Sequence, residues 1–103
     1  MKRSIRMNPS DNVTTALANL DAGETIQVVS ASQEPLEQLK ALQPISFGHK
    51  IALNKIEKGS NIVKYGEVIG IATQSIEKGN HVHVHNVESA RIQMPKAVRE
   101  RKG

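Results

Sequence analysis

The sequence predicts a small all-β domain made of short strands and single helical turns. The 103 residues suit one domain. Seven Gly and four Pro indicate frequent tight turns, and several β-rich or alternating runs of four to seven residues lie between them. We expect an aliphatic core, because Phe47 and Tyr65 are the only aromatic residues.

A segment that occurs three times without gaps organises the chain. Its pattern is Ala-x-x-x-[Leu/Ile]-x-x-Gly-x-x-[Ile/Val], and the copies begin at Ala16, Ala52 and Ala72. In each copy we expect the Leu or Ile to enter the core and the Gly to adopt a positive φ at little cost. Uneven spacing between the copies argues against a solenoid and favours one compact β fold that reuses a turn. The glycines expected at equivalent turns are Gly23, Gly59 and Gly79.

The strands follow from residue type and alternation. Expected strands cover residues 25–31, 50–53, 61–65, 68–72 and 81–87. In the last of these, Val82 and Val84 should point into the core. The leucines at 36, 39 and 42 suit a short helix that begins at Pro35, but a strand or a loop fits equally well. Both interpretations of that segment stay open.

The distribution of charge divides the chain into three parts and argues against a nucleic-acid-binding protein. The net charge is +4, and basic residues gather at both ends, so we expect a basic N-terminal segment (1–10), a domain (11–89) and a basic, flexible C-terminal tail (90–103). These ends are either solvated or attract an acidic partner or anionic substrates. Nucleic-acid binding is disfavoured because no aromatic stacking platform accompanies the charge.

The chain contains no cysteine, which excludes disulfides, thiolate zinc sites and cysteine nucleophiles. No apolar run approaches the roughly 20 residues of a membrane span, and no apolar stretch follows the basic start as in a secretory signal. We therefore expect a cytoplasmic protein with no membrane association.

Three histidines carry the clearest chemical signal. On a strand, His81, His83 and His85 would share one face, because successive side chains point to opposite faces. Imidazoles can transfer protons or bind metals. The alternative is a half-exposed face whose imidazoles bond to backbone, water or one another. A three-ligand metal site within this chain has weak support, because no Asp or Glu completes it and Glu88 lies past the row.

Two further segments are candidates for binding. Gly48 would let the backbone approach a ligand at His49 and Lys50, and Lys50 suits a carboxylate. A plain turn with a solvated lysine is the alternative. Tyr65 could offer its phenol to a substrate or pack in the core or an interface. The sequence has no phosphate loop, no Gly-x-Ser-x-Gly and no suitably spaced pair of carboxylates.

Taken in order, four stretches resemble a known family: DNVTTALANLDAGETI, GHKIAL, KGSNIVKYGEVIGIAT and IEKGNHVHVHN. They are similar to the N-terminal SAF domain of altronate and galactarate dehydratases and to the small subunit of sulfolactate sulfo-lyase. The resemblance runs from about Asp11 to Ser89, and residues 33–46 depart from it most. It implies an SAF-type β-clip fold and a separate, large catalytic subunit.

The resemblance also implies a function. The chain would be the small subunit of a hydro-lyase that removes water, or sulfite, from a hydroxy acid with the help of divalent iron or manganese. The metal would be held mainly by the large subunit, with His83 and His85 as candidate ligands on this chain. The implied catalytic residues are His81, His83 and His85, and the implied substrate-binding residues are His49, Lys50, Tyr65 and Asn86.

A non-catalytic SAF module for ligand binding or assembly is the alternative function. SAF-like domains of that kind occur in antifreeze proteins, sialic-acid synthases and pilus-assembly proteins. The histidine row favours the lyase, because a binding module does not need three titratable groups on one strand face. We expect no activity without the large subunit. Neither the hydroxy acid nor the oligomeric state follows from the sequence.

Overall fold

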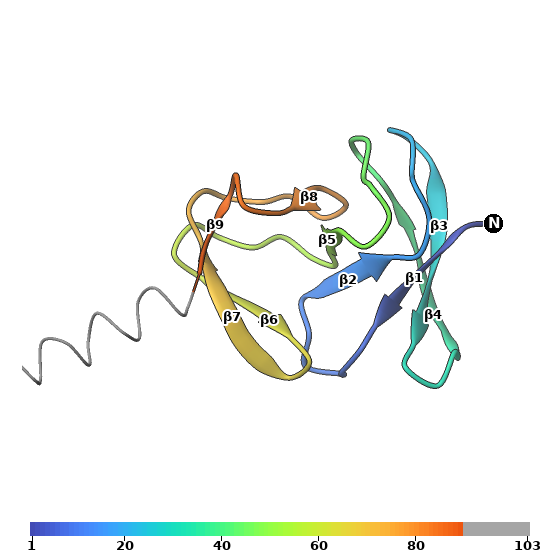
Figure 1. The fold of residues 1–103 in the computed structure, drawn as a ribbon, viewed down its shortest axis with the longest axis horizontal. Helices are drawn as coiled ribbons and strands as arrows, with labels where there is room; N and C mark the ends of the chain where they lie inside the picture. The colour runs from blue at the N-terminus through green and yellow to red at the C-terminus, as the bar shows by residue number, and fades with distance from the viewer. Residues whose placement is uncertain (90–103) are drawn as a thin grey trace, which may run out of the picture.

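The computed structural model describes residues 1–89, which form nine strands and no helix in that range. Six strands make one sheet, in the order β4-β3-β1-β2-β5-β8, and three make a second, β6-β7-β9 (Figure 1). The strands are β1 (Arg3–Arg6), β2 (Val13–Ala16), β3 (Thr25–Ser30), β4 (Pro35–Lys40), β5 (Lys50–Ala52), β6 (Asn61–Lys64), β7 (Glu67–Ala72), β8 (His81–Val82) and β9 (Val87–Ser89).

The all-β prediction is confirmed, but the expected single helical turns are absent from residues 1–89, where bends and tight turns take their place. Residues 1–89 contain no helix that is long and apolar enough to cross a membrane. The C-terminal tail predicted for residues 90–103 lies outside the described residues.

The first strand corrects the predicted N-terminal boundary. Residues 1–10 were expected to precede the domain, yet β1 lies between β3 and β2 in the larger sheet, parallel to β3 and antiparallel to β2. Ser4 is fully buried, and its hydroxyl accepts a hydrogen bond from Thr14 Oγ1 at 2.8 Å. The sequence did not predict this strand, because its buried residue, Ser4, is polar and its two end residues, Arg3 and Arg6, are charged.

Four of the expected strands are present as β3, β5, β6 and β7, with ends that differ by one residue. The segment left open between helix and strand is β4, an edge strand antiparallel to β3. Its Leu39 is buried whereas Leu36 is 40% exposed. The single strand predicted over residues 81–87 is wrong: β8 ends at Val82, and Val84, expected in the core, is 81% exposed.

The structure reveals a fourth copy of the repeated segment. Residues 41–51 read Ala-Leu-Gln-Pro-Ile-Ser-Phe-Gly-His-Lys-Ile and match the pattern at every defined position. The four glycines have φ angles of 87°, 85°, 88° and 90° at Gly23, Gly48, Gly59 and Gly79, respectively. The predicted equivalence of the three turns is therefore confirmed and extends to Gly48.

The four copies pair, the first with the second and the third with the fourth. Isolated bridges join Leu20 to Ile45 and Ile56 to Ile76. In every copy the glycine N–H donates to the carbonyl oxygen of the alanine that opens the paired copy, at 2.6–2.9 Å. That alanine donates its own N–H to the carbonyl oxygen of the residue after the glycine, at 2.9–3.0 Å. Each pair is thus closed by reciprocal backbone hydrogen bonds.

Each pair of copies also encloses its own aliphatic cluster. All twelve alanine, leucine, isoleucine and valine positions that define the pattern are buried. Phe47 and Tyr65 are 65% and 57% exposed, so the core is aliphatic as predicted. The pattern positions in the first cluster are Ala16, Leu20, Ile26, Ala41, Ile45 and Ile51. Those in the second are Ala52, Ile56, Ile62, Ala72, Ile76 and Val82.

Two polar residues join the smaller sheet to the larger one. The Asp11 carboxylate accepts hydrogen bonds from the N–H groups of Tyr65 and Gly66, at 3.0 and 2.8 Å. The Asn12 side chain donates to the carbonyl oxygen of Asn61 and accepts from the N–H of Val63, both at 2.8 Å. These bonds hold the β6–β7 hairpin and the residues at its turn in one place.

We predict that two equivalent glycines differ in their tolerance of alanine. Gly59→Ala should cost about 1 kcal/mol, because only the positive φ is unfavourable and the added Cβ meets no atom within 4 Å. Gly79→Ala should cost roughly 1–3 kcal/mol more, because its Cβ would collide with the Lys40 carbonyl oxygen. Urea denaturation of both variants checks this. Equal losses would mean that packing around Gly79 does not matter.

Candidate functional site

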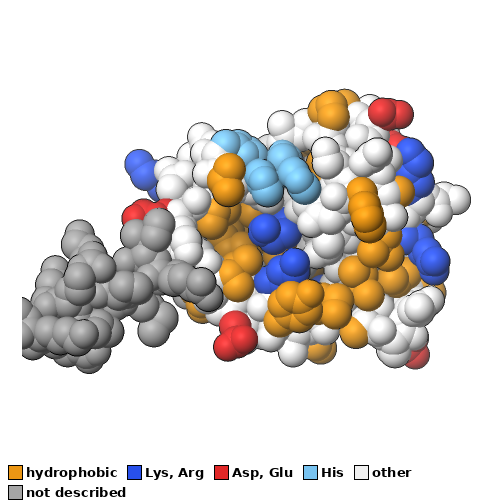
Figure 2. Space-filling model, in the orientation of Figure 1, with side chains coloured by type: hydrophobic (Ala, Val, Ile, Leu, Met, Phe, Trp, Pro, Cys, Tyr) orange, Lys and Arg blue, Asp and Glu red, His pale blue; other side chains and the backbone are white. Residues whose placement is uncertain are grey.

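The repeat turns bring distant histidines to one face of the molecule. His49 directly follows Gly48, and His81 begins β8 two residues after Gly79. Strands β5 and β8 are antiparallel, with Ile51 opposite His81. Figure 2 shows the histidine side chains gathered in one patch, with Lys or Arg side chains directly beside it.

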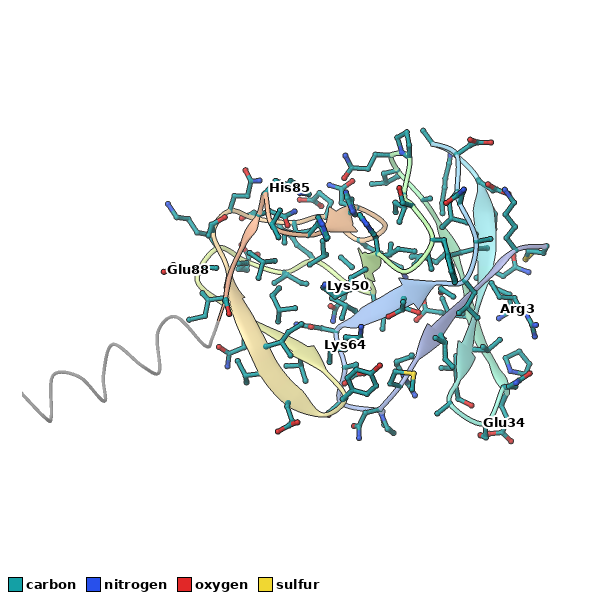
Figure 3. All side chains as sticks on the ribbon, viewed as in Figure 1. Arg3, Glu34, Lys50, Lys64, His85 and Glu88 are labelled. Carbon is teal, nitrogen blue, oxygen red and sulfur yellow. The ribbon has the colours of Figure 1, made fainter. Side chains whose placement is uncertain are left out.

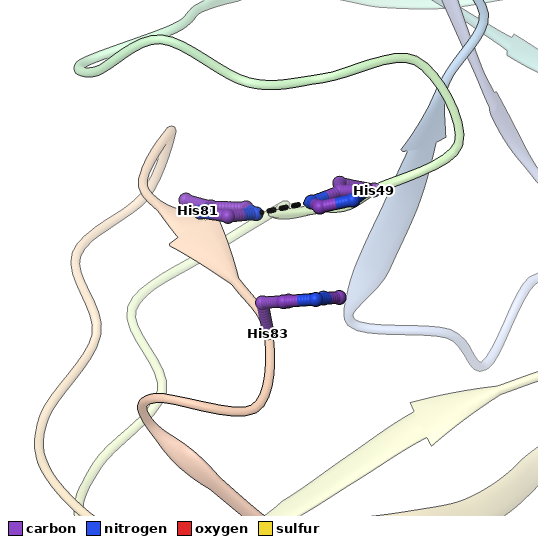
Figure 4. A group of neighbouring side chains, drawn as sticks. All are labelled: His49, His81 and His83. Carbon is purple, nitrogen blue, oxygen red and sulfur yellow. Dashed lines mark hydrogen bonds between the residues drawn. The ribbon is translucent and has the colours of Figure 1, made fainter.

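Three imidazoles are in direct contact (Figure 4). His49 Nδ1 lies 2.8 Å from His81 Nε2. The ring of His49 stacks on those of His81 and His83, with centroid distances of 5.0 and 4.1 Å. One ring nitrogen from each of the three lies within 4.8 Å of the others. The exposed His85 stays at the edge, its tilted ring 5.2 Å from that of His81.

A turn, and not a strand, holds His83 in this group. Asn86 is 4% exposed; its Oδ1 accepts a hydrogen bond from the His83 N–H and its Nδ2 donates to the His81 carbonyl oxygen. The Asn86 N–H donates to the His83 carbonyl oxygen, so the chain reverses and Val84 faces outward. Asn86, predicted to bind substrate, has its amide engaged in shaping this turn.

The site disfavours positive charge on His81 and His83. Burial lowers the pKa of His81 to about 4, helped by the charges of the other three histidines and Lys50. Burial, followed by the charges of His49, Lys50 and His85, also lowers the pKa of His83. His83 Nδ1 is buried without a hydrogen-bond partner. A ligand or metal would therefore meet a neutral His81 and the unpartnered Nδ1 of His83.

Lys50 lies next to the histidines, and Lys64 lies beside Lys50. Figure 3 shows Lys50 and Lys64 side by side, although they come from different sheets. Burial lowers the pKa of Lys50, and the charge of Lys64 lowers it further. The exposed Tyr65 joins this surface through Lys64, whose Nζ lies 5.1 Å from the centre of the tyrosine ring. The sequence placed Lys64 in a candidate segment with Tyr65 but gave Lys64 no role of its own.

The donor set fits a divalent transition metal. Imidazole nitrogens are common ligands of such ions, and the unpartnered His83 Nδ1 would gain a partner. The structure groups His83 with His49 and His81, whereas the sequence paired it with His85 as candidate ligands. His49 could not be recognised as part of the cluster because 32 residues separate it from His81.

Comparisons with known proteins agree on one family. The family model described as altronate/galactarate dehydratase SAF domain matches residues 2–90. Altronate dehydratase of Bacillus subtilis is 40% identical over 89 residues, which are 86% of this chain and 17% of the relative. The (2R)-sulfolactate sulfo-lyase subunit alpha of Chromohalobacter salexigens is 35% identical over 72 residues, 70% of this chain and 77% of the relative.

Galactarate dehydratase (L-threo-forming) of Escherichia coli is 33% identical over 78 residues, 76% of this chain and 14% of the relative. The chain thus spans about a sixth of the length of the dehydratases and about three quarters of the sulfo-lyase subunit. These matches confirm the resemblance found in the motifs.

We predict that the histidine cluster destabilises the fold in acid. The pKa of His81 is lowered from 6.5 to about 4, so the unfolded chain binds this proton more readily. Stability is therefore full above pH 6.5 and falls as the pH drops towards 4. Urea midpoints at about pH 7 and about pH 5, in buffer with EDTA, should differ more for the natural chain than for His81→Gln. The same acid loss in both proteins would contradict the prediction.

Proposed function

The chain belongs to the altronate/galactarate dehydratase SAF-domain family, and from this we propose that it is the small component of a metal-assisted lyase acting on a hydroxy acid. The reaction would eliminate water or sulfite. The observation that carries the proposal is the cluster of His49, His81 and His83 beside Lys50. These groups suit the removal of an α-proton next to a carboxylate, which requires a base and a positive charge that stabilises the developing negative charge.

The roles of the residues follow from their positions. His49, His81 and His83 would hold a divalent metal such as iron or manganese, which would stabilise negative charge that develops on the substrate. The low pKa of His81 suits a ligand better than a general base, which works best when its pKa is near the working pH. His85, exposed beside the three, would transfer the proton. Lys50 would bind the substrate carboxylate.

A large catalytic partner completes the proposal. The matched segment covers only a small fraction of the dehydratases, and the sulfo-lyase relative that it largely covers is named as a subunit alpha. Apart from this one cluster, residues 1–89 hold no other group of three potential metal ligands. The remaining acid, base and substrate contacts would come from the larger polypeptide, which would close over the histidine face.

We predict that activity requires the partner. The purified chain should not turn over altronate, galactarate or sulfolactate in buffer with iron or manganese, and should do so together with a large dehydratase-type polypeptide. Product formation assayed with each component and with the mixture checks this. Robust turnover by the chain on its own would contradict the subunit proposal. Substrate binding by the mixture without turnover would favour a non-catalytic SAF module.

We predict that two histidine variants separate metal binding from proton transfer. His83→Ala should lower both the metal content and the turnover of the complex. His85→Ala should lower turnover by roughly a hundredfold, the scale of losing a general acid or base, with metal content unchanged. Neither change should shift the melting temperature by more than a few degrees, because neither removes a core contact.

Lys58→Gln, at an exposed residue that has no ion pair within residues 1–89, is the control and should leave activity unchanged. Metal content by elemental analysis, turnover and melting temperature would be measured on the same preparations. Full activity in both histidine variants would remove the cluster from the active site.

A further inference from the structure

The backbone that carries His81 and His83 is bonded to two amide side chains. β8 ends the larger sheet and pairs with β5, so its other side is a sheet edge. Gln43 Oε1 accepts a hydrogen bond from the His81 N–H at 2.8 Å. Asn86 bonds the His81 carbonyl oxygen and both backbone groups of His83. These two residues take the place of a neighbouring strand along the histidines.

The backbone on either side of Gln43 is fixed. The Leu42 N–H donates to the Gly79 carbonyl oxygen at 3.0 Å, and Ile45 forms an isolated bridge with the paired repeat copy. Pro44 follows Gln43 directly and restricts the backbone of Gln43 to extended conformations. The side chain of Gln43 therefore starts from a backbone that is already ordered, which lowers the entropy cost of holding its amide at His81.

The segment that carries Gln43 also carries His49. Both belong to the repeat copy at residues 41–51, and both bond to His81, Gln43 at the backbone N–H and His49 Nδ1 at the ring Nε2. Two points of attachment fix the position of His81 and the direction of its ring. We propose that Gln43 is a positioning residue that holds His81 against His49 and keeps the cluster with His83 assembled. The inference rests on the proposed function, because it takes these histidines as the metal ligands.

The repeat itself does not require glutamine at this position. The equivalent residues of the other three copies are Ala18, Asn54 and Gln74. Gln74 is exposed, whereas Gln43 is half-buried and bonded to His81. Because the turn forms with alanine or asparagine there, the bond of Gln43 serves His81 and not the turn. Gln74 offers a matched control at the same position of the repeat.

Three variants test the inference. Gln43→Met removes the acceptor and keeps the length of the side chain, Gln43→Glu keeps an acceptor oxygen, and Gln74→Met is the control. In the metal-free, isotope-labelled full chain at neutral pH, NMR would measure hydrogen exchange at the His81 amide and nuclear Overhauser contacts between the rings of His49 and His81. Zn²⁺, a diamagnetic probe of imidazole ligands, would then be titrated into the same samples. The same spectra report whether each variant is folded.

We expect Gln43→Met to speed hydrogen exchange at the His81 amide and to weaken the contacts between the two rings. Its Zn²⁺ affinity should be about tenfold lower than that of the natural chain, the lower end of what losing a bond that orients a metal ligand costs. Gln43→Glu should restore slow exchange and the ring contacts. Gln74→Met should match the natural chain in all these measurements.

Three results would overturn the inference. One is a Gln43→Met variant that keeps both the ring contacts and the Zn²⁺ affinity. Another is the same loss in Gln74→Met, which would mean a general effect on the repeat. The third is failure of Gln43→Met to fold, which would mean that Gln43 supports the fold and not the cluster. The lyase proposal fails separately: if the natural chain does not bind Zn²⁺ through its histidines, the metal role is wrong, and the ring contacts of the metal-free chain still decide the role of Gln43.

Discussion

The reciprocal backbone hydrogen bonds between paired repeats are the constraint on which the rest of this structure depends. Each bond runs from the N–H of a glycine at positive φ to the carbonyl oxygen of a buried alanine, and a second bond returns from that alanine. The arrangement needs glycine for its φ and a small residue for the close approach of the backbones. Once the four turns are closed in this way, the apolar side chains of each repeat point into one of the two aliphatic clusters.

The geometry of the repeat also determines where functional side chains can lie. Between the glycine and the final apolar residue of each repeat lie two positions that the pattern leaves free. His49 and Lys50 occupy them in the second copy, and His81 occupies the second of them in the fourth. Because β5 pairs with β8, these free positions meet on one face although their copies belong to different pairs. The scaffold thus supplies a rigid surface whose composition can change without disturbing the core.

The histidine and lysine side chains determine the electrostatic properties of this face. Within residues 1–89 it gathers four imidazoles and two ammonium groups, and none of them is paired with a carboxylate. Burial and mutual repulsion keep His81 neutral at pH 7 and lower the pKa of Lys50. A surface of this kind is poor at holding the fold together and well suited to attract an anion or a metal, which is what an elimination next to a carboxylate requires.

The sequence by itself determined the fold class, the family, the aliphatic core and the glycine turns, because φ preference and apolar periodicity are properties of neighbouring residues. The fourth repeat, at residues 41–51, was not predicted, although the full pattern is present there. The leucine spacing after Pro35 suggested a helix in that region instead. Only the tertiary structure decided three things: the central place of β1, the turn that Asn86 imposes on the histidine row, and the meeting of His49 and Lys64 with residues far away in the chain. These depend on backbone pairing and side-chain bonds, most of them between segments 24 to 54 residues apart, and such pairing leaves no periodic trace in the sequence.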